Sequence, residues 1–333
     1  MRGTMPRYNR ALDSPARGGS GALELISGLH NLRDRHRGSV VTIGAFDGVH
    51  RGHQAVIADL LARSRTLGLP ATVIVFEPLP REYFAPLQAP PRLMSFREKF
   101  GVLAGLGVHR LLRIRFDRNF STLSAHEFID TVLVRGLGAR HVVVGDDLRF
   151  GHDREGNVEL LRREGEHAGF EVKATGTVAV QGERISSTRL RAVLAAGDFA
   201  SAERMLGRPY SMLGKVVYGQ QLGRSIGVPT ANIELRRLRS PLSGVYVVEV
   251  RVDGRLLPAV ANVGTRPTVS DGIRANLETH LLDFTGNLYG RTIEVIFRRL
   301  VREERKFGSL DELRENIADD IGVARAYFAA CSP

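Results

Sequence analysis

Two histidines and three glycines stand in the stretch GAFDGVHRGH, residues 44–53, directly after the apolar run VVTI at 40–43. An apolar run followed by glycine and then by helical spacing predicts a strand that turns into a helix. The N-terminus of a helix presents unpaired N–H groups and a positive dipole end, which favour anions. His50 and His53, three residues apart, can point the same way and donate hydrogen bonds to a phosphorus centre. We therefore expect phosphate chemistry here rather than a glycine-rich turn with surface histidines.

The same loop offers further groups for a nucleotide. Gly44, Gly48 and Gly52 lack side chains, so backbone and phosphate can approach each other closely. We expect Gly44, Phe46, Asp47 and Gly48 to line the nucleotide site, with the two histidines at the reacting phosphate.

A second glycine-rich stretch, GKVVYGQQLGRSIGVPTANI, covers residues 214–233. Pro229 fixes the backbone just before Thr230 and Asn232, whose side chains, two apart on an extended segment, face the same way. A hydroxyl and an amide oxygen suit Mg²⁺, which shares its ligand shell with ATP phosphates and water. By residue types alone, a glycine-rich hairpin with an asparagine turn explains the stretch equally well. The residues expected in a flap over the phosphates are Gly214, Gly219, Gly223, Arg224 and Gly227.

The elements that must position these residues fall into two halves. Between Val40 and about Leu206, short apolar runs alternate with amphipathic stretches of helical spacing, which predicts βαβ units and a parallel sheet. In such sheets ligands bind beyond the carboxyl ends of the strands, where residues 44–53 fall. The strands are expected at 40–46, 71–76, 110–116 and 141–147, and the helices at 52–68, 96–107 and 125–138.

Beyond a helical segment at 187–207, with Asp198 as the N-cap of its second piece, the pattern changes. Valine-rich strands separated by glycine turns predict a compact antiparallel barrel, and an amphipathic helix follows from Ser309. The fold class is therefore α/β followed by β. The barrel strands are expected at 214–219, 244–254, 257–264, 277–284 and 292–301, and the domains at 22–206 and 207–333, after a basic tail at 1–21.

Length and composition limit the class of protein. A chain of 333 residues is long enough for two domains, each with its own core. No apolar run approaches the ~20 residues that span a bilayer. The only cysteine, Cys331, excludes a disulfide framework and favours a reducing compartment. Residues 1–21 lack the apolar core of a secretory signal, so we expect a cytoplasmic protein.

The net charge of +11 invites a nucleic-acid interpretation. The arginines, however, are scattered along the chain rather than gathered in one stripe. A basic surface would equally attract nucleotides and small phosphorylated substrates. Charge alone therefore does not decide the partner.

The His-x-Gly-His pattern at 50–53 resembles the signature of nucleotidyltransferases and class I aminoacyl-tRNA synthetases, whose histidines stabilise charge on the α-phosphate of ATP. The second, lysine-rich signature of the synthetases is not found. Instead ISSTRLR, residues 185–191, resembles the second motif of bacterial FAD synthetases, although alone it could be a helix N-cap. VVVGDDLRFG, residues 142–151, resembles that family's adenine- and ribose-side loop. The resemblance implies that Ser186, Ser187, Thr188 and Arg189 hold the outgoing phosphates, and that Asp147 contacts the nucleoside.

Two positions depart from the family pattern. In FEPLPREYF, residues 76–84, Leu79 stands where several relatives carry a histidine. Leu148 replaces the aromatic residue that is usual in the 142–151 loop. We therefore assign no role to Leu79 and expect no flavin stacking at Leu148.

Residues 214–233 strongly resemble the riboflavin kinase domain, whose Pro-Thr-Ala-Asn segment binds Mg-ATP, and the resemblance continues through LETHLLDFTGNLYGR at 277–291. It implies that Glu278 is the general base on the ribityl 5′-hydroxyl, because an alcohol attacks the γ-phosphoryl group better when a carboxylate takes its proton. His280 lies on the same strand face as a neighbour or a bystander, and Asp283 is expected in a turn.

Together these motifs identify the chain as a member of the bacterial bifunctional riboflavin kinase/FAD synthetase family over about residues 22–330. Membership implies a Rossmann-like nucleotidyltransferase domain, a barrel-shaped riboflavin kinase domain, Mg²⁺, ATP as co-substrate, and riboflavin, FMN and FAD as substrates and products. No nucleic acid or membrane partner is expected, and the oligomeric state, a homo-oligomer included, stays open.

Two other functions stay open. One is a monofunctional adenylyltransferase with a decayed barrel, against which the intact Thr230, Asn232 and Glu278 speak. The other is an RNA-binding protein, which would need exposed stacking aromatic residues beside a basic stripe. Aromatic residues make up only 7% of the chain, with no tryptophan, which disfavours RNA binding.

Overall fold

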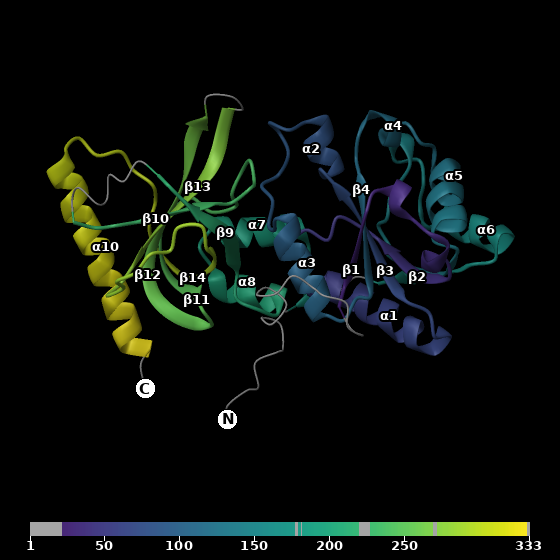
Figure 1. Ribbon diagram of the computed structural model, residues 1–333, viewed down its shortest axis with the longest axis horizontal. Helices are drawn as coiled ribbons and strands as arrows, with labels where there is room; N and C mark the ends of the chain where they lie inside the picture. Colours follow the sequence, from purple (N-terminus) through teal and green to yellow (C-terminus); the bar gives the residue numbers. More distant parts are fainter. Residues whose placement is uncertain (1–21, 177–178, 181, 220–226, 269–271, 332–333) are drawn as a thin grey trace. The chain divides into compact units, whose positions relative to one another are not determined.

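The computed structural model describes residues 22–176, 179–180, 182–219, 227–268 and 272–331 (Figure 1). The chain forms two compact units, each described by itself below. Unit 1 comprises Met1–Pro90 and Lys99–Ile185, and unit 2 comprises Pro91–Glu98 and Ser186–Pro333. A short segment from the first half of the sequence, Pro91–Glu98, thus belongs to unit 2. The tail at 1–21 lies outside the described residues, and the domain boundary at 206/207 stays a prediction.

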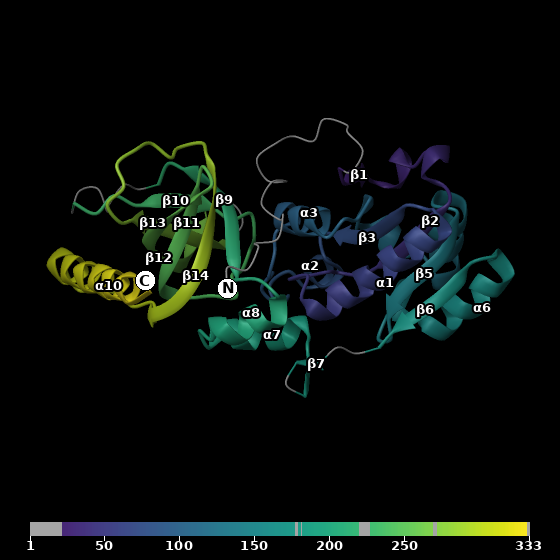
Figure 2. The same ribbon diagram turned by 90° about the horizontal axis from the view of Figure 1, so that it is seen from below.

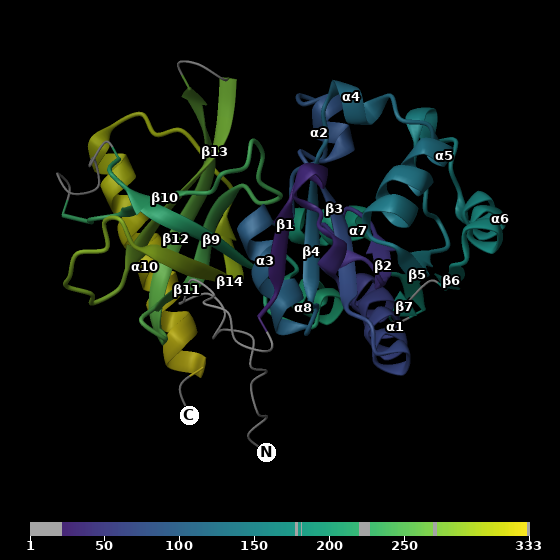
Figure 3. The same cartoon turned by 45° about the vertical axis from the view of Figure 1, so that its right-hand side comes forward.

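Unit 1 is built on a six-stranded parallel sheet in the order β1-β4-β3-β2-β5-β6, which confirms the expected α/β class (Figure 3). The two edge strands, β1 and β6, were not expected, because their sequences ELIS and EVKAT are short and lack a continuous apolar run. A separate two-stranded sheet pairs β7 with β8. The strands are β1 Glu24–Ser27, β2 Ser39–Ile43, β3 Ala71–Glu77, β4 Arg110–Arg115, β5 Ala139–Gly145, β6 Glu171–Thr175, β7 Ala179–Val180 and β8 Glu183–Arg184.

The three helices expected from the spacing are present, and one of them differs in type. Further helices, α2, α4 and α6 among them, were not expected. The stretch 125–138 begins as α5, capped by Ser124, and continues from Ile129 as a π-helix rather than as one α-helix. In the described part of the chain, no helix is long and apolar enough to cross a membrane. The helices up to residue 168 are η2 Leu29–Asn31, η3 Asp34–His36, α1 Arg51–Leu67, α2 Pro80–Phe84, α3 Phe96–Gly105, α4 Arg118–Ser121, α5 Ala125–Phe128, η4 Ile129–Gly136, η5 His152–Arg154 and α6 Val158–Ala168.

The parallel sheet is buried on both faces. Consecutive residues of β2, which point to opposite faces, are fully buried: Val40, Val41 and Thr42. On one face α5, η4 and α6 cover an apolar cluster that includes Phe128 and Val132, and α1 packs against β2 and β5. The loop that leaves the carboxyl end of β2 is therefore held by a rigid core strand.

Unit 2 contains a closed antiparallel barrel, as predicted, and its strand order is β10-β13-β12-β11-β14-β9. Strand β10, of four residues, was not among the five strands expected. Two helices precede it, and Asp198 caps the second of them, accepting a hydrogen bond from Ser201 N. The terminal helix is also confirmed. The elements are α7 Ser187–Ala195, α8 Phe199–Leu206, β9 Ser211–Val217, β10 Ala231–Glu234, β11 Gly244–Val252, β12 Arg255–Thr268, β13 Gly272–Leu281, β14 Thr292–Arg302 and α10 Leu310–Cys331.

Strand β13 shows which side chains point into the barrel. Leu277, Thr279 and Leu281 are buried, whereas the alternate residues Glu278 and His280 are only half-buried. Since successive side chains alternate between faces, the buried set lines the interior and the other set faces outward. The helix α10 packs on the outer face over β11 and β12 (Figure 2).

The segment Pro91–Glu98 is held in unit 2 by a buried ion pair. Nη2 of Arg237 lies 2.8 and 2.7 Å from the two carboxylate oxygens of Glu98, and the two side chains are 0% and 8% exposed. Glu98 Oε1 also accepts a hydrogen bond of 2.6 Å from Leu213 N on β9. Arg237 Nη1 donates to the carbonyl of Leu93 and to the Tyr210 hydroxyl. The two charges thus compensate each other inside unit 2.

Removing one partner of a buried ion pair leaves the other charge uncompensated. We expect Arg237→Met to destabilise the barrel by about 3–5 kcal/mol. Hydrogen exchange of the β11 amides, followed by mass spectrometry, measures this local stability. In the control Arg325→Met, which removes an exposed ion pair with Asp283, exchange should stay close to that of the wild type. Equal exchange in both variants would contradict the role of the Arg237–Glu98 pair.

Candidate active sites

His50 is the N-cap of α1, so the histidine pair lies at the start of that helix. Its Nδ1 accepts a hydrogen bond of 3.3 Å from the backbone N–H of His53. A neutral imidazole that accepts at Nδ1 carries its proton on Nε2. The cap therefore places the proton of a neutral His50 ring on Nε2.

The two imidazoles lie side by side, as their spacing predicted. Their ring centroids are 3.7 Å apart with an interplanar angle of 12°, and Phe46 packs against His53 at 5.1 Å. A Cβ atom at Gly52 would lie 3.2 Å from the ring of His50, tighter than most real contacts. Glycine at position 52 thus makes room for the His50 ring.

The loop before α1 has an unusual backbone. Phe46 and Val49 have positive φ angles of 46° and 39°, which cost side-chain-bearing residues roughly 1–3 kcal/mol each. Lys99, only 1% exposed, donates a hydrogen bond of 2.7 Å to the carbonyl of Ala45 and lies 3.8 Å from Glu77. The lysine thereby anchors the loop, a role for which its sequence context gave no signal.

Asp47 is buried in this loop, and Gly44 follows directly after β2. Gly48 has a φ of 87°, a conformation that glycine adopts without strain. The structure thus brings the predicted nucleotide residues of the first motif together in one turn.

The second predicted motif lies at the start of α7 in unit 2. Ser186 is the N-cap of that helix and accepts a hydrogen bond of 3.2 Å from Arg189 N, which confirms the N-cap interpretation. Ser187, Thr188 and Arg189 form the first turn. This turn has the backbone polarity of an anion site, but the bond to Ser186 already occupies one N–H.

Asp147 follows β5 and forms an exposed ion pair of 2.6 Å with Arg184. Leu148, which departs from the family pattern, packs against the apolar cluster of unit 1. Leu79 caps α2, and its N–H donates to Glu82. The two leucines thus have local structural roles.

In unit 2 the sheet register places Asn232 on β10 directly opposite Glu278 on β13, and Asn262 on β12 opposite Glu278 on its other side. Directly opposite residues share a face, so this polar row lies on the outer face of the barrel. Asn232 is 6% exposed, and its Oδ1 has no hydrogen-bond partner among the described residues. A buried amide oxygen without a partner is ready to accept from, or ligate, a bound group.

Glu278 is held from its own strand. Asn276 Nδ2 donates a hydrogen bond of 3.0 Å to Glu278 Oε1, which orients the carboxylate. Sequence reasoning missed Asn276, although its position two residues before Glu278 already placed it on the same face. His280, two residues after Glu278, contacts the Pro229 carbonyl with Nδ1 at 2.8 Å.

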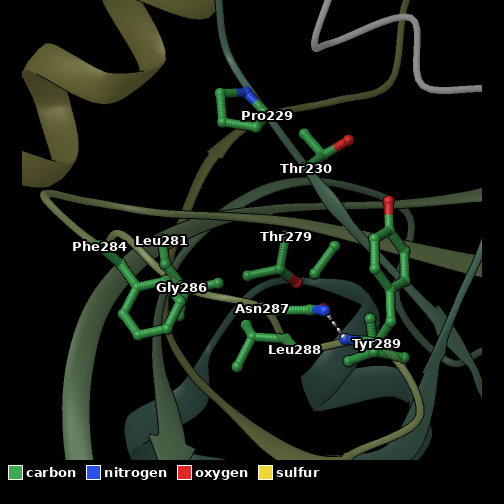
Figure 4. Close-up of a pocket in the computed structure, with 11 residues that line it drawn as sticks. Pro229, Thr230, Thr279, Leu281, Phe284, Gly286, Asn287, Leu288 and Tyr289 are labelled. Atoms are coloured by element: carbon green, nitrogen blue, oxygen red, sulfur yellow. Dashed lines mark hydrogen bonds between the residues drawn. The ribbon is translucent and has the colours of Figure 1, made fainter.

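A pocket of about 160 Å³ opens beside Thr230 (Figure 4). Tyr289 lines it and stacks on Tyr218 with centroids 4.0 Å apart. Asn232 borders a separate hollow of about 470 Å³, so the expected common orientation of Thr230 and Asn232 stays a prediction. The residues that line the first pocket are Val216, Pro229, Thr230, Ala231, Thr279, Leu281, Phe284, Gly286, Asn287, Leu288 and Tyr289.

Of the glycines expected over the phosphates, Gly214 is part of β9, and Gly219 and Gly227 are described, whereas Gly223 and Arg224 lie outside the described residues. Asp283 has a φ of 54° in a turn, as expected, and hydrogen bonds from Arg325 hold the pKa of its carboxyl below its usual value. Among the residues that the structure describes, no group of three or more His, Cys, Asp or Glu side chains could hold a metal ion.

Comparison with family models and with known proteins shows the family to which this chain belongs. A family model of FAD synthetase matches residues 32–189, and one of riboflavin kinase matches residues 206–328. A bifunctional riboflavin kinase/FMN adenylyltransferase from Pseudomonas fluorescens is 51% identical over 307 residues, covering 92% of this chain and 98% of that protein. The chain belongs to the bifunctional riboflavin kinase/FMN adenylyltransferase family.

Further relatives agree with membership of the bifunctional riboflavin kinase/FMN adenylyltransferase family. The protein of that name from Escherichia coli K12 is 50% identical over 313 residues, covering 93% of this chain and all of that protein. Among solved structures, a chain named macrolide-efflux protein from Streptococcus pneumoniae matches with a TM-score of 0.74 and 32% identity, covering 91% of this chain and 99% of that one. The resemblance stated from the motifs is therefore confirmed, and so is the two-part fold.

The packing of Gly219 gives a test of the second site. A Cβ atom there would lie 2.3 Å from Cγ of Asn232, so Gly219→Ala must displace the buried amide. We expect riboflavin phosphorylation to fall on the order of tenfold to a hundredfold, because misplacement by about 1 Å has effects of that size. The control Gly322→Ala adds a Cβ in open space on α10 and should leave the rate unchanged. Steady-state assays of FMN formation measure both.

Proposed function

We propose that this chain makes FAD in two ATP-dependent steps. Unit 2 transfers the γ-phosphoryl group of ATP to the 5′-hydroxyl of riboflavin, giving FMN and ADP. The histidine pair of unit 1 serves the transfer of AMP from a second ATP to the FMN phosphate, with release of pyrophosphate. The observation that carries the proposal is that one chain of this family has both a His-x-Gly-His pair at the start of a helix and the Asn232–Glu278 row.

In the adenylyl transfer, the two histidines stabilise negative charge on the α-phosphoryl group as pyrophosphate leaves. His50 donates from Nε2, since its Nδ1 accepts from the helix backbone. The start of α1 adds the positive end of its dipole. No covalent enzyme intermediate is needed, because positioning and charge stabilisation lower the barrier.

Residues of the other two adenylyltransferase motifs bind the rest of the nucleotide. We assign Arg189 and the hydroxyls of Ser186, Ser187 and Thr188 to the outgoing phosphates. Asp147 is assigned to the nucleoside. The family model of FAD synthetase, which spans residues 32–189, includes all of them together with the histidine pair.

In the kinase reaction, Glu278 takes the proton of the ribityl 5′-hydroxyl as that oxygen attacks the γ-phosphorus. The bond from the phosphorus to the β,γ-bridging oxygen breaks, and ADP leaves. Asn276 orients the carboxylate through Oε1. Gly219, Gly223, Arg224 and Gly227 are assigned to the phosphates of ATP.

Magnesium fits the donor set of this site. Thr230 and Asn232 supply a hydroxyl and an amide oxygen, and the buried Oδ1 of Asn232 has no partner in the described part of the protein. Hard cations of this kind prefer oxygen ligands and keep part of their water. A bound Mg²⁺ would neutralise charge on the ATP phosphates, while the protein positions the alcohol and the carboxylate.

The enzyme works on small molecules, and we propose that it does so in the cytoplasm without nucleic acid or a membrane as partner. A single cysteine in the whole chain suits a reducing compartment. A basic surface suits the phosphates of nucleotides and flavins. Incubating the protein with riboflavin, ATP and Mg²⁺, and separating the flavins by chromatography, tests both steps. FAD made only from added FMN would instead indicate a monofunctional adenylyltransferase.

For the first site, we expect His50→Ala and His53→Ala to abolish conversion of FMN to FAD, because the α-phosphoryl charge loses its donors. Losing one such donor costs on the order of a hundredfold to a thousandfold in rate. FMN formation from riboflavin, measured in the same samples, should be unchanged. Normal adenylyl transfer in both variants would remove the histidines from the mechanism.

For the second site, Glu278→Ala should suppress FMN formation by about a hundredfold or more, since general base catalysis contributes effects of that size. Added FMN should still be converted to FAD at the wild-type rate. The substitution Glu234→Ala, at an exposed carboxylate on β10, is the matched control. Full kinase turnover in the Glu278 variant would show that another group takes the proton.

A further inference from the structure

His280 makes a contact that the reaction above does not use. Its Nδ1 lies 2.8 Å from the carbonyl oxygen of Pro229, a residue 51 positions earlier in the chain. A carbonyl only accepts hydrogen bonds, so Nδ1 of His280 must carry a proton. Proline has no N–H, which makes this carbonyl the one hydrogen-bonding group of the Pro229 backbone.

The hydrogen bond between His280 and Pro229 lies just beyond the end of the pairing between β10 and β13. The ladder between β10 and β13 pairs Ile233 with Leu277, Asn232 with Glu278, and Ala231 with Thr279, and it ends there. One more step would bring Thr230 opposite His280. Thr230 instead lies outside the ladder, between Ala231, which is paired, and Pro229, which the histidine side chain holds.

Both neighbours of Thr230 are therefore held in place. Ala231 is held by backbone pairing with Thr279, and Pro229 is held by the side chain of His280. Pro229 is exposed, and Thr230 is half-buried at the edge of the pocket in Figure 4. Without the His280 bond, the segment before Ala231 would be free to rotate about the backbone of Thr230. Its hydroxyl would then lose a defined position relative to Asn232.

We propose that His280 is a positioning residue of the kinase reaction, which holds the Pro229 carbonyl so that the Thr230 hydroxyl is placed for the Mg²⁺ of bound nucleotide. The proposal rests on the kinase function proposed for unit 2. It gives His280 no contact with riboflavin and no part in proton transfer. Its effect is confined to binding of the magnesium nucleotide.

Two substitutions separate the hydrogen bond from the bulk of the ring. In His280→Asn, the Nδ2 amide occupies nearly the position of the imidazole Nδ1 and can donate to the same carbonyl. In His280→Leu, a side chain of similar size has no donor. The full-length proteins are compared for the Kd of ADP by calorimetry, with Mg²⁺ and with EDTA, and for the KM values of Mg-ATP and riboflavin.

We expect His280→Leu to raise the Kd of ADP in Mg²⁺ and the KM of Mg-ATP about fivefold, the usual effect of one net hydrogen bond. His280→Asn should stay within about twofold of the wild type, since it keeps the donor. In EDTA the three proteins should bind ADP alike, and the KM of riboflavin should not change. Because they differ only at residue 280, any change in the isotherm reports the site in unit 2.

Two controls accompany the test. Conversion of added FMN to FAD should be the same in all variants. His167→Leu removes an equivalent bond of 2.7 Å from a histidine Nδ1 to the Arg163 carbonyl on α6 and should leave every kinase parameter unchanged. Equal Kd values for wild type and His280→Leu, or equal losses in the Leu and Asn variants, would overturn the proposal. A wild-type protein that makes no FMN would instead overturn the kinase function itself.

Discussion

The ladder between β10 and β13 holds Asn232 opposite Glu278, and the second site depends on that register. Side chains alternate between the two faces of a strand, so a one-residue slip of β13 would turn Glu278 into the barrel. The interior would then receive a carboxylate in place of Leu277 or Thr279, which are fully buried. Packing of the barrel core thus fixes the chemistry on its outside, because only one register buries the apolar set.

The first site follows the same logic with a parallel strand. Val40 and Val41 are fully buried, so β2 is held in the core, and α1, with His50 as its N-cap, begins eight residues after the end of β2. Between them, Lys99 holds the Ala45 carbonyl while Phe46 and Val49 accept strained conformations. In both candidate sites a regular element carries one of the proposed catalytic groups, and a side chain distant in sequence holds a backbone carbonyl nearby.

The sequence predicted what local patterns encode. Short apolar runs predicted strands β2 to β5, and valine-rich strands between glycine turns predicted the barrel. Asp198 predicted the start of α8. The edge strands β1 and β6 were not predicted, because they are short and half-exposed. The π-helix at 129–136 was predicted as an α-helix, because a π-helix has no distinct sequence pattern. Lys99 and the histidine contact with Pro229 depend on pairing of distant segments, which a single sequence does not reveal. Asn276 is only two residues from Glu278, so strand alternation could have placed it on the same face.

Membership of Pro91–Glu98 in unit 2 affects how the protein can be divided. A fragment cut from the gene at codon 207 would contain the whole barrel and Arg237, but not Glu98. A guanidinium that is fully enclosed would then lack its counter-ion, and Leu213 N would lose its acceptor. Unit 2 is thus continuous in space but not in sequence. A polypeptide made to carry the kinase activity alone therefore has to include the eight residues Pro91–Glu98 as well as the barrel.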